Sequence, residues 1–219
     1  MNVIVFSKDR ACQLDAFLSS CEHHFPGVKD CNVSIIYRFT TADYEKGYNV
    51  CKQSHPRYKW ILEQTGQFKA HVMNAIDANR MFTVFFVDDQ IWTAPFSKND
   101  QELKNFGVTG QQICLSLRLH PGLTYCYAMN VKMVCPKLLH KNLWHWASAS
   151  GDFGYPMSLD GHIFKTKKVL LSLKEFDFNN PNQLEGSWVK RPILNKYLMG
   201  CYDTPRVINI PHNKAIVCV

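Results

Sequence analysis

Two adjacent carboxylates, Asp88 and Asp89, stand directly after a long apolar run that begins at Met81. Paired acids supply hard oxygen ligands for a divalent cation, and such a cation can in turn hold a phosphate group. The alternative is a polar strand end that merely leads into a turn. Which of the two applies depends on the elements that position the two acids.

The apolar run 81–87 is rich in aromatic and β-branched residues and is too short to span a membrane. It therefore predicts a buried central strand of a parallel sheet. Shorter apolar runs before it alternate with segments of helical spacing, so strands are expected over 3–6, 33–37 and 59–62 and helices over 12–21, 43–51 and 68–78. This alternation predicts an α/β fold with a mostly parallel, doubly wound sheet, in which ligands bind beyond the carboxyl ends of the strands.

The pattern loosens after Gln90. Alternating residues indicate strands on both sides of a turn at 120–122, and a glycine-rich loop at 150–156 carries Asp152. A strand over 158–164, helices over 167–176 and 182–190, and a last strand over 207–210 are expected. Because no linker divides the chain, we expect one domain over 1–219, with a nucleotide-type half (1–92) and an irregular half (93–219) that shapes a cleft.

The composition excludes several classes of protein. The chain has 219 residues, a formal net charge of +7 and 46% hydrophobic residues, which suits a folded domain with a phosphate-bearing partner. The basic residues are too dispersed to favour nucleic acid, and no apolar segment is long enough to span a membrane. Nine scattered cysteines without a CxxC pair favour reduced thiols over a zinc or disulfide framework. The first residues form a strand pattern without a signal-peptide charge pattern, so we expect a cytoplasmic protein.

The sequence resembles a family of GT-A-type glycosyltransferases that includes bacterial proteins and a domain of a chlorella-virus multidomain protein. The resemblance rests on six segments in the same order along nearly the whole chain, which are Val5–Arg10, Phe86–Asp89, Ser116–Leu119, Gly154–Phe164, Asn180–Gly186 and Asn209–Pro211. It implies a single GT-A-like domain that moves a hexosyl or deoxyhexosyl group from a nucleotide diphosphate sugar, expected to be UDP-linked, to a glycan acceptor. It also implies a Mn²⁺ or Mg²⁺ cofactor and, as in one relative, a possible place within a longer multidomain chain.

The resemblance assigns the metal and the diphosphate to Asp88, Asp89 and Gln90, with His212 as a further ligand beyond the last strand. One departure concerns Gln90, because the family's acidic motif resembles three consecutive aspartates. A glutamine carbonyl is neutral and binds Mg²⁺ or Mn²⁺ more weakly than a carboxylate. A lone histidine such as His212 is commonly an ordinary surface or core residue, so both roles stay open.

Polar and aromatic residues at the ends of the first two strands are candidates for the nucleotide pocket, because strand ends of a parallel sheet face the ligand. They join the acidic pair in a nucleotide-sugar set of Phe6, Ser7, Arg10, Tyr37, Arg38, Arg57, Asp88 and Asp89. The structural alternatives are that Arg10 only helps to cap a helix and that Arg57 is a solvated loop residue.

Three acids compete for the role of catalytic base in an inverting transfer, namely Glu185, Asp160 and Asp152. Glu185 lies near a helix start, where a carboxylate is stabilised, and the resemblance places Asp160 beside the donor sugar. Either is alternatively structural, through capping or a turn. Aromatic residues that would stack on acceptor sugars are Trp144, Trp146, Tyr155 and Trp188, although buried aromatics commonly belong to the core.

Two rival functions remain on sequence grounds. A catalytically silent GT-A-like module would bind nucleotide or glycan without turnover, and Gln90 supports it. A nucleotidyltransferase would also use a metal on an α/β sheet, but the segment from Phe6 to Arg10 contains no glycine, whereas such enzymes typically carry a glycine-rich phosphate loop there.

Overall fold

The first half of the chain builds four parallel strands, as the alternation of strand and helix patterns predicts. The computed structural model describes residues 1–140, 142–189 and 196–210. The four strands are β1 (Asn2–Lys8), β2 (Asn32–Arg38), β3 (Lys59–Leu62) and β4 (Phe82–Val87). They lie in the order β3-β2-β1-β4, and β1 pairs with both β2 and β4 in parallel. The first and the fourth strands in sequence are therefore neighbours in space.

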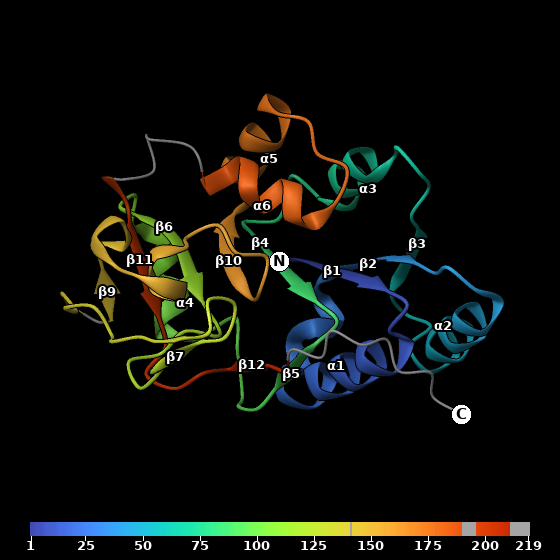
Figure 1. Ribbon diagram of the computed structural model, residues 1–219, viewed down its shortest axis with the longest axis horizontal. Helices are drawn as coiled ribbons and strands as arrows, with labels where there is room; N and C mark the ends of the chain where they lie inside the picture. Colours follow the sequence, from blue (N-terminus) through green and yellow to red (C-terminus); the bar gives the residue numbers. More distant parts are fainter. Residues whose placement is uncertain (141, 190–195, 211–219) are drawn as a thin grey trace.

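The second half extends the same sheet to eight strands in the order β3-β2-β1-β4-β10-β6-β11-β9. β10 (His162–Lys165) lies antiparallel between β4 and β6 (Gln112–Ser116). β11 (Leu198–Cys201) pairs in parallel with β6, and β9 (Leu143–Trp144) forms the antiparallel edge. The two predicted halves thus share one sheet (Figure 1).

Two small antiparallel pairs lie outside the main sheet. β5 (Gln90–Trp92) pairs with β12 (Val207–Asn209), and β7 (Tyr125–Cys126) pairs with β8 (Val131–Lys132). The first pair joins the segment after the acidic residues to a segment more than a hundred positions later. The second pair forms a hairpin that carries exposed tyrosines.

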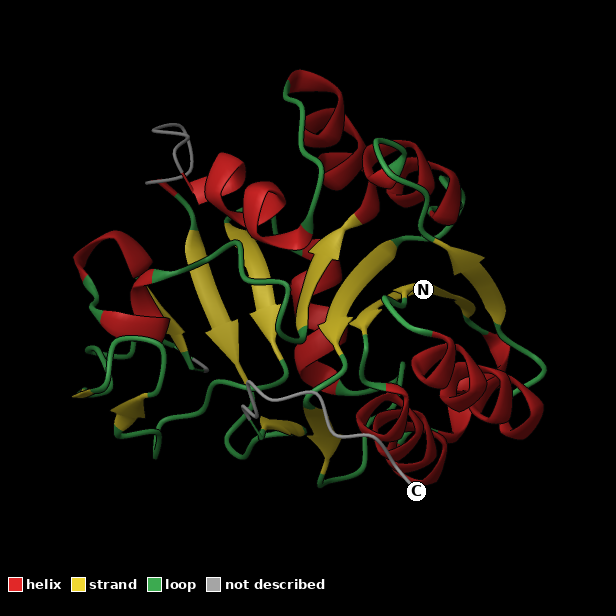
Figure 2. Cartoon of the chain, turned by 45° about the vertical axis from the view of Figure 1, so that its right-hand side comes forward, coloured by secondary structure: helices red, strands yellow, loops and turns green. Residues whose placement is uncertain are grey.

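Helices cover both faces of the sheet, as Figure 2 shows. α1 (Ala11–His24), α2 (Ala42–Ser54) and α4 (Gln101–Val108) pack on one face, and α3 (Phe68–Ala75), α5 (Thr166–Glu175) and α6 (Pro181–Val189) pack on the other. The alternation within β4 explains the two cores: Val84 and Phe86 belong to the first and Phe85 belongs to the second. Short 3₁₀ turns at Pro26–Asp30, Trp146–Ser148 and Gly151–Gly154 complete the described elements.

The expected α/β class with a mostly parallel, doubly wound sheet is confirmed. One expected strand differs from the structure: of the range 158–164, only the part from His162 is a strand, and the residues before it form a turn. Seven cysteines are free thiols, as expected, but Cys12 is disulfide-bonded, which corrects the expectation at that position. Among the described residues, no helix has both the length and the apolar character needed to cross a membrane.

Candidate active site

The boundary between β1 and β4 is the point where the sheet reverses its winding. The connections after β1 and β2 run through α1 and α2 on one face, whereas α3 covers the opposite face before β4. Loops therefore diverge at the carboxyl ends of β1 and β4 and leave a crevice there, where open α/β sheets bind ligands. Asp88 and Asp89 follow β4 directly, so they lie at this point of the sheet.

Asp88 faces the loop after β1. Its carboxylate accepts hydrogen bonds from the Lys8 backbone N–H and the Arg10 guanidinium, each at 3.3 Å. Burial raises the pKa of Asp88, although Ser7, Arg10 and Lys8 favour the charged form. Asp88 therefore ties the β4 loop to the β1 loop and holds the Arg10 side chain beside the acidic motif.

Asp89 carries negative charge that the protein does not fully compensate. Its Oδ1 is buried and has no hydrogen-bond partner among the described residues, and Arg10 lies 3.7 Å from Oδ2. Burial, followed by the charges of Asp160 and Asp88, raises the pKa of Asp89 to about 6. This carboxylate oxygen is buried, has no partner among the described residues and lies close to further acids. A divalent cation bound there would supply the missing partner and offset the repulsion between the negative charges.

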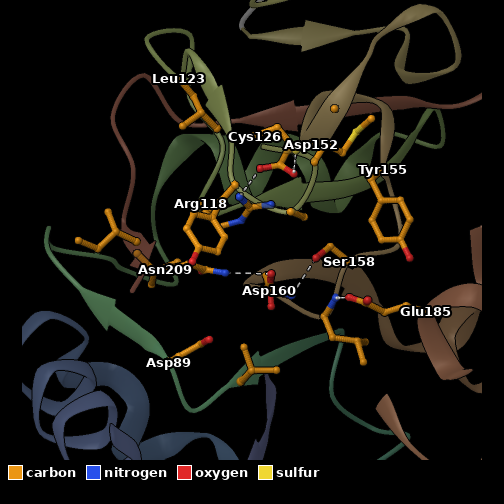
Figure 3. Close-up of a pocket in the computed structure, with 18 of the residues that line it drawn as sticks. Asp89, Arg118, Leu123, Cys126, Asp152, Tyr155, Ser158, Asp160, Glu185 and Asn209 are labelled. Carbon is orange, nitrogen blue, oxygen red and sulfur yellow. Dashed lines mark hydrogen bonds and ion pairs between the residues drawn. The ribbon is translucent and has the colours of Figure 1, made fainter. Parts of the chain in front are cut away.

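A cavity of about 840 Å³ opens beside Asp89. Asp89, Asp152, Asp160 and Glu185 all line it, together with Arg118 (Figure 3). These residues come from the loop after β4, the 3₁₀ turn at 151–154, the turn before β10, the first half of α6 and the loop after β6. The fold therefore gathers all three candidate bases and the second acid of the motif around one space.

Asp160 lies among the acids that line this cavity (Figure 3). Its carboxylate accepts a 2.9 Å hydrogen bond from the Asn209 side chain, and its backbone N–H donates to the Ser158 hydroxyl. Gly161 follows with φ +76°, a conformation that L side chains rarely adopt, and this allows the sharp turn into β10. Burial raises the pKa of Asp160, while Arg118 and Asn209 act in the opposite direction.

Glu185 reaches the same cavity from α6. Its Oε1 accepts a 2.6 Å hydrogen bond from the Leu159 backbone N–H, which fixes the side chain against the turn. Burial raises the pKa of Glu185 to about 7, assisted by the charge of Asp160 and opposed by the bond from Leu159. A carboxylate with a pKa near neutrality can exchange protons at physiological pH, as general bases do.

Asp152 has a different environment from the other two candidate bases. It forms a 2.7 Å ion pair with Arg118 and accepts a hydrogen bond from the Cys126 thiol at 3.2 Å. Although burial alone would raise its pKa, Arg118 and Cys126 outweigh that effect and the pKa of Asp152 is lowered. Asp152 is thus a poor proton acceptor and a good anchor for Arg118.

The predicted nucleotide residues separate into two groups. Arg10 and Ser7 lie next to the acidic motif, and the Ser7 hydroxyl shares a 2.6 Å hydrogen bond with Tyr48. The others are engaged elsewhere: Phe6 stacks on Phe85 in the core, Tyr37 packs against Tyr48 and Trp60, Arg38 pairs with Glu63, and Arg57 pairs with Glu22.

Gln90 does not project into the large cavity. It is fully buried, its Oε1 accepts from the Val87 backbone N–H at 3.3 Å, and its Nε2 donates to Asn209 at 2.9 Å. The amide therefore holds β12 against the acidic loop. His212, the other predicted metal ligand outside the acidic pair, lies outside the described residues.

Of the four predicted acceptor aromatics, Tyr155 lines the cavity. Trp144 and Trp188 are fully buried and Trp146 is 8% exposed, so the structure places these three in the core. Trp144 donates a 2.8 Å hydrogen bond to the Phe153 carbonyl, and Trp188 packs edge-on against Phe85 and Phe164.

The lining residues that were absent from the sequence-based candidates include Arg118, Asn209, Tyr125 and Tyr127. Arg118 and Asn209 lie within two of the resemblance segments, so those segments carried a signal for them. The two tyrosines are 43% and 58% exposed and stand two residues apart in the hairpin segment. In the sequence, the two tyrosines are visible as aromatic residues that alternate with Cys126. That alternation is the pattern from which they could have been proposed as cavity residues.

No protein-family model matches the chain. Among curated proteins, the chain is 21% identical over 230 residues to the bifunctional glycosyltransferase pgtA of Dictyostelium discoideum. The match covers 90% of this chain but 29% of pgtA, so the chain spans less than a third of that relative.

Solved structures share the fold at low sequence identity. The mannosyltransferase PcManGT from Pyrobaculum calidifontis, in complex with GDP-Man and Mn²⁺, matches with a TM-score of 0.51 and 11% identity over 97% of this chain and 58% of that one. S. aureus TarS 1–349 matches with a TM-score of 0.56 and 13% identity over 95% of this chain and 60% of that one. The fold is therefore that of GT-A-type glycosyltransferases, which confirms the resemblance noted from the sequence.

Proposed function

We propose that this chain is a glycosyltransferase that moves a sugar from a nucleoside diphosphate sugar to a hydroxyl of a glycan acceptor. The observation that carries the proposal is the convergence of Asp89, Asp160 and Glu185 on one cavity at the point where the sheet reverses its winding. The GT-A fold and the match to pgtA support the same reaction class.

Glu185 is the proposed base. Its carboxylate lies on the cavity wall, is held by the Leu159 backbone, and has a pKa of about 7. An ionised Glu185 would accept the proton of the acceptor hydroxyl as that oxygen attacks the sugar, which is the role of the base in an inverting reaction. Asp160, whose carboxylate accepts a hydrogen bond from Asn209 and whose charge raises the pKa of Asp89, is assigned to cation binding instead.

Asp89 and Asp160 are the proposed cation ligands, and we call their part of the cavity the cation side. The orphaned Oδ1 of Asp89 and the effect of the Asp160 charge on the pKa of Asp89 fit a divalent cation. A bound Mn²⁺ or Mg²⁺ would neutralise the diphosphate as it leaves. Arg10, which already faces both Asp88 and Asp89, would hold a diphosphate oxygen on the other side.

The nucleotide of the donor is proposed to be UDP. GDP is the alternative, because PcManGT was solved with GDP-Man. A panel of UDP-, GDP- and dTDP-sugars, each with Mn²⁺, Mg²⁺ or EDTA, separates these possibilities by donor hydrolysis. Hydrolysis of one donor class in the presence of metal supports the proposal. Donor binding without any turnover would instead support a catalytically silent module, which the structural use of the Gln90 amide also favours.

The acidic residues provide the sharpest test of the site. We expect Asp89→Asn to abolish metal-dependent hydrolysis, because it removes the negative charge of a carboxylate whose buried Oδ1 has no hydrogen-bond partner among the described residues. The matched control is Asp43→Asn, which alters an exposed carboxylate that pairs with Lys46. Equal hydrolysis by Asp89→Asn, Asp43→Asn and the unmodified chain would move the reaction away from this cavity.

A further inference from the structure

A second group of metal-ligating side chains lies between α1 and α2, away from the cavity. Among the described residues, the ligand atoms of Asp15, Cys51 and His55 all lie within 4.8 Å of one another. None of the three lines the large cavity, and the proposed transfer reaction does not use them. Cys51 and His55 are buried, whereas the side chain of Asp15 is 46% exposed, so the group opens to solvent on one side.

The helical spacing of these residues explains why they meet. Cys51 and His55 are four residues apart at the end of α2, where the His55 backbone N–H bonds to the Cys51 carbonyl. Residues with this spacing lie on the same helical face. Asp15 comes from the facing side of α1, and its Oδ1 lies 3.1 Å from His55 Nε2.

The far side of the His55 ring is also arranged as it is in metal sites. His55 Nδ1 lies 3.0 Å from Glu22 Oε1, and Glu22 is itself held by the Tyr58 hydroxyl at 2.8 Å and by Arg57 at 2.7 Å. A histidine that ligates a metal typically donates its other ring N–H to a carboxylate in this way, which fixes its tautomer and orientation. Glu22 thus directs Nε2 toward Asp15 and Cys51, where it can act as a ligand.

We propose that Asp15, Cys51 and His55 form a zinc site between α1 and α2, with Glu22 as the residue that positions His55. The donor set selects the ion: thiolate and imidazole with one carboxylate suit Zn²⁺, whereas Mg²⁺ and Mn²⁺ prefer oxygen ligands. Zinc bonds of roughly 2.0 to 2.3 Å separate tetrahedral ligand atoms by roughly 3 to 4 Å. The present spacing needs only small adjustments to reach that geometry, and water from the exposed side completes the fourth position.

Binding exchanges a proton for the ion. Burial, followed by the charge of Asp15 and a hydrogen bond to it, raises the pKa of Cys51 to about 12, so the thiol is protonated without metal. On binding, the Cys51 S–H bond breaks, the thiolate coordinates zinc, and the proton leaves to the buffer. The ion then joins α1 to α2 through their side chains.

The experiment uses the full chain, stripped with a chelator, and titrates Zn²⁺ against a chromophoric competitor and then Co²⁺ as an optical substitute. We expect one tight Zn²⁺ per chain, a thiolate-to-cobalt charge-transfer band, and a melting temperature raised by Zn²⁺. Cys51→Ser should remove the band and the tight site, while Cys31→Ser, which alters another free thiol, should keep both.

Two further variants test the positioning role of Glu22 and the independence of the zinc site from the cavity. Glu22→Gln keeps the size of the side chain and should weaken Zn²⁺ binding by about 10- to 100-fold, as expected for a partner of a metal-ligating histidine. Asp89→Asn should leave the zinc site intact, which separates it from the cation side of the cavity. A cobalt complex without the band in the unmodified chain, or equal zinc affinity in Cys51→Ser, would show that the three residues form only a hydrogen-bonded cluster.

Discussion

At the scale of single residues, environment separates acids that look alike in the sequence. Arg118 and Cys126 lower the pKa of Asp152, whereas burial raises the pKa of Asp89 to about 6 and that of Glu185 to about 7. The sequence could nominate these acids but could not rank them, because the ranking depends on Arg118, Asn209 and the Leu159 backbone, which are distant in the chain. Their roles follow from partners rather than from residue type.

Glu185→Gln should both inactivate the protein and stabilise it at high pH. Because the folded pKa is raised to about 7, folded Glu185 keeps a proton that the unfolded chain has already released, so stability falls as pH rises from the ordinary glutamate pKa through 7. Glutamine has no charge to bury, so the variant should gain on the order of 1 kcal/mol at pH 8 and nothing near pH 4. Urea unfolding at both pH values measures this difference.

The activity of the same pair of proteins provides the second readout. Turnover by the unmodified chain should decline as pH falls below about 7, because the base must be ionised, and Glu185→Gln should be about 10²- to 10⁴-fold slower. A variant that is inactive but not stabilised at pH 8 would contradict the proposed pKa. A variant that keeps its turnover would exclude Glu185 as the base.

At the scale of elements, the turn before β10 depends on Gly161. A Cβ at this position would lie 3.0 Å from the Val207 side chain and 3.3 Å from the Phe86 ring, and φ is +76°. Gly161→Ala should therefore destabilise the fold by about 1–3 kcal/mol. It should also lower turnover, since the turn positions Asp160.

The matched control for this change is Gly110→Ala, where a Cβ meets nothing within 4 Å and φ is not positive. Denaturant midpoints of the two variants and the unmodified chain give the comparison. Equal stability of Gly161→Ala and Gly110→Ala would mean that the turn relaxes without cost and that close packing around Gly161 does not constrain the fold.

The hairpin of β7 and β8 presents Tyr127 to the cavity, while β9 buries Trp144 in the core. Tyr127→Ala should therefore reduce transfer to a glycan acceptor but leave donor hydrolysis and stability nearly unchanged. Trp144→Ala should instead cost about 3–5 kcal/mol of stability, as expected for a buried tryptophan. Loss of transfer without loss of stability in Trp144→Ala would reverse these assignments.

The strands differ in how well the sequence predicted their bounds. Apolar runs predicted β1, β2 and β4 to within about two residues, because each is buried on both faces and its pattern is local. The strand expected over 158–164 was too long, because its first residues are held in a turn by Ser158 and Glu185. Aromatic side chains gave no means of distinguishing core from cavity, since the same residue types serve both.

At the scale of the whole molecule, donor binding should be visible as global stabilisation. A ligand at about 100-fold above its dissociation constant adds about 2.7 kcal/mol to the free energy of unfolding. We expect the matching nucleoside diphosphate to raise the melting temperature only with Mn²⁺ or Mg²⁺ present, and Arg10→Ala to reduce the shift. No shift with any nucleoside diphosphate would argue against a donor site at the end of β4.

The eight-stranded sheet explains why the overall architecture was predictable and the complete site was not. The parallel, doubly wound character of β1 to β4 follows from the local alternation of strand and helix patterns, whereas their order β3-β2-β1-β4 is seen only in the structure. The insertion of β10 between β4 and β6 is non-local, and it brings Asp160 beside Asp89. Only the resemblance, which included both segments, indicated that they belong to one site.

The pairing of β12 with β5 also has a consequence during synthesis. A ribosome makes Asp88 and Asp89 long before it makes Asn209, whose amide group bonds both Gln90 and Asp160. While the chain is still growing, the acidic loop therefore lacks the strand that orders it. The candidate site is therefore completed late in translation. A nascent or prematurely terminated chain that ends before Val207 would have most of the sheet but would lack the proposed activity.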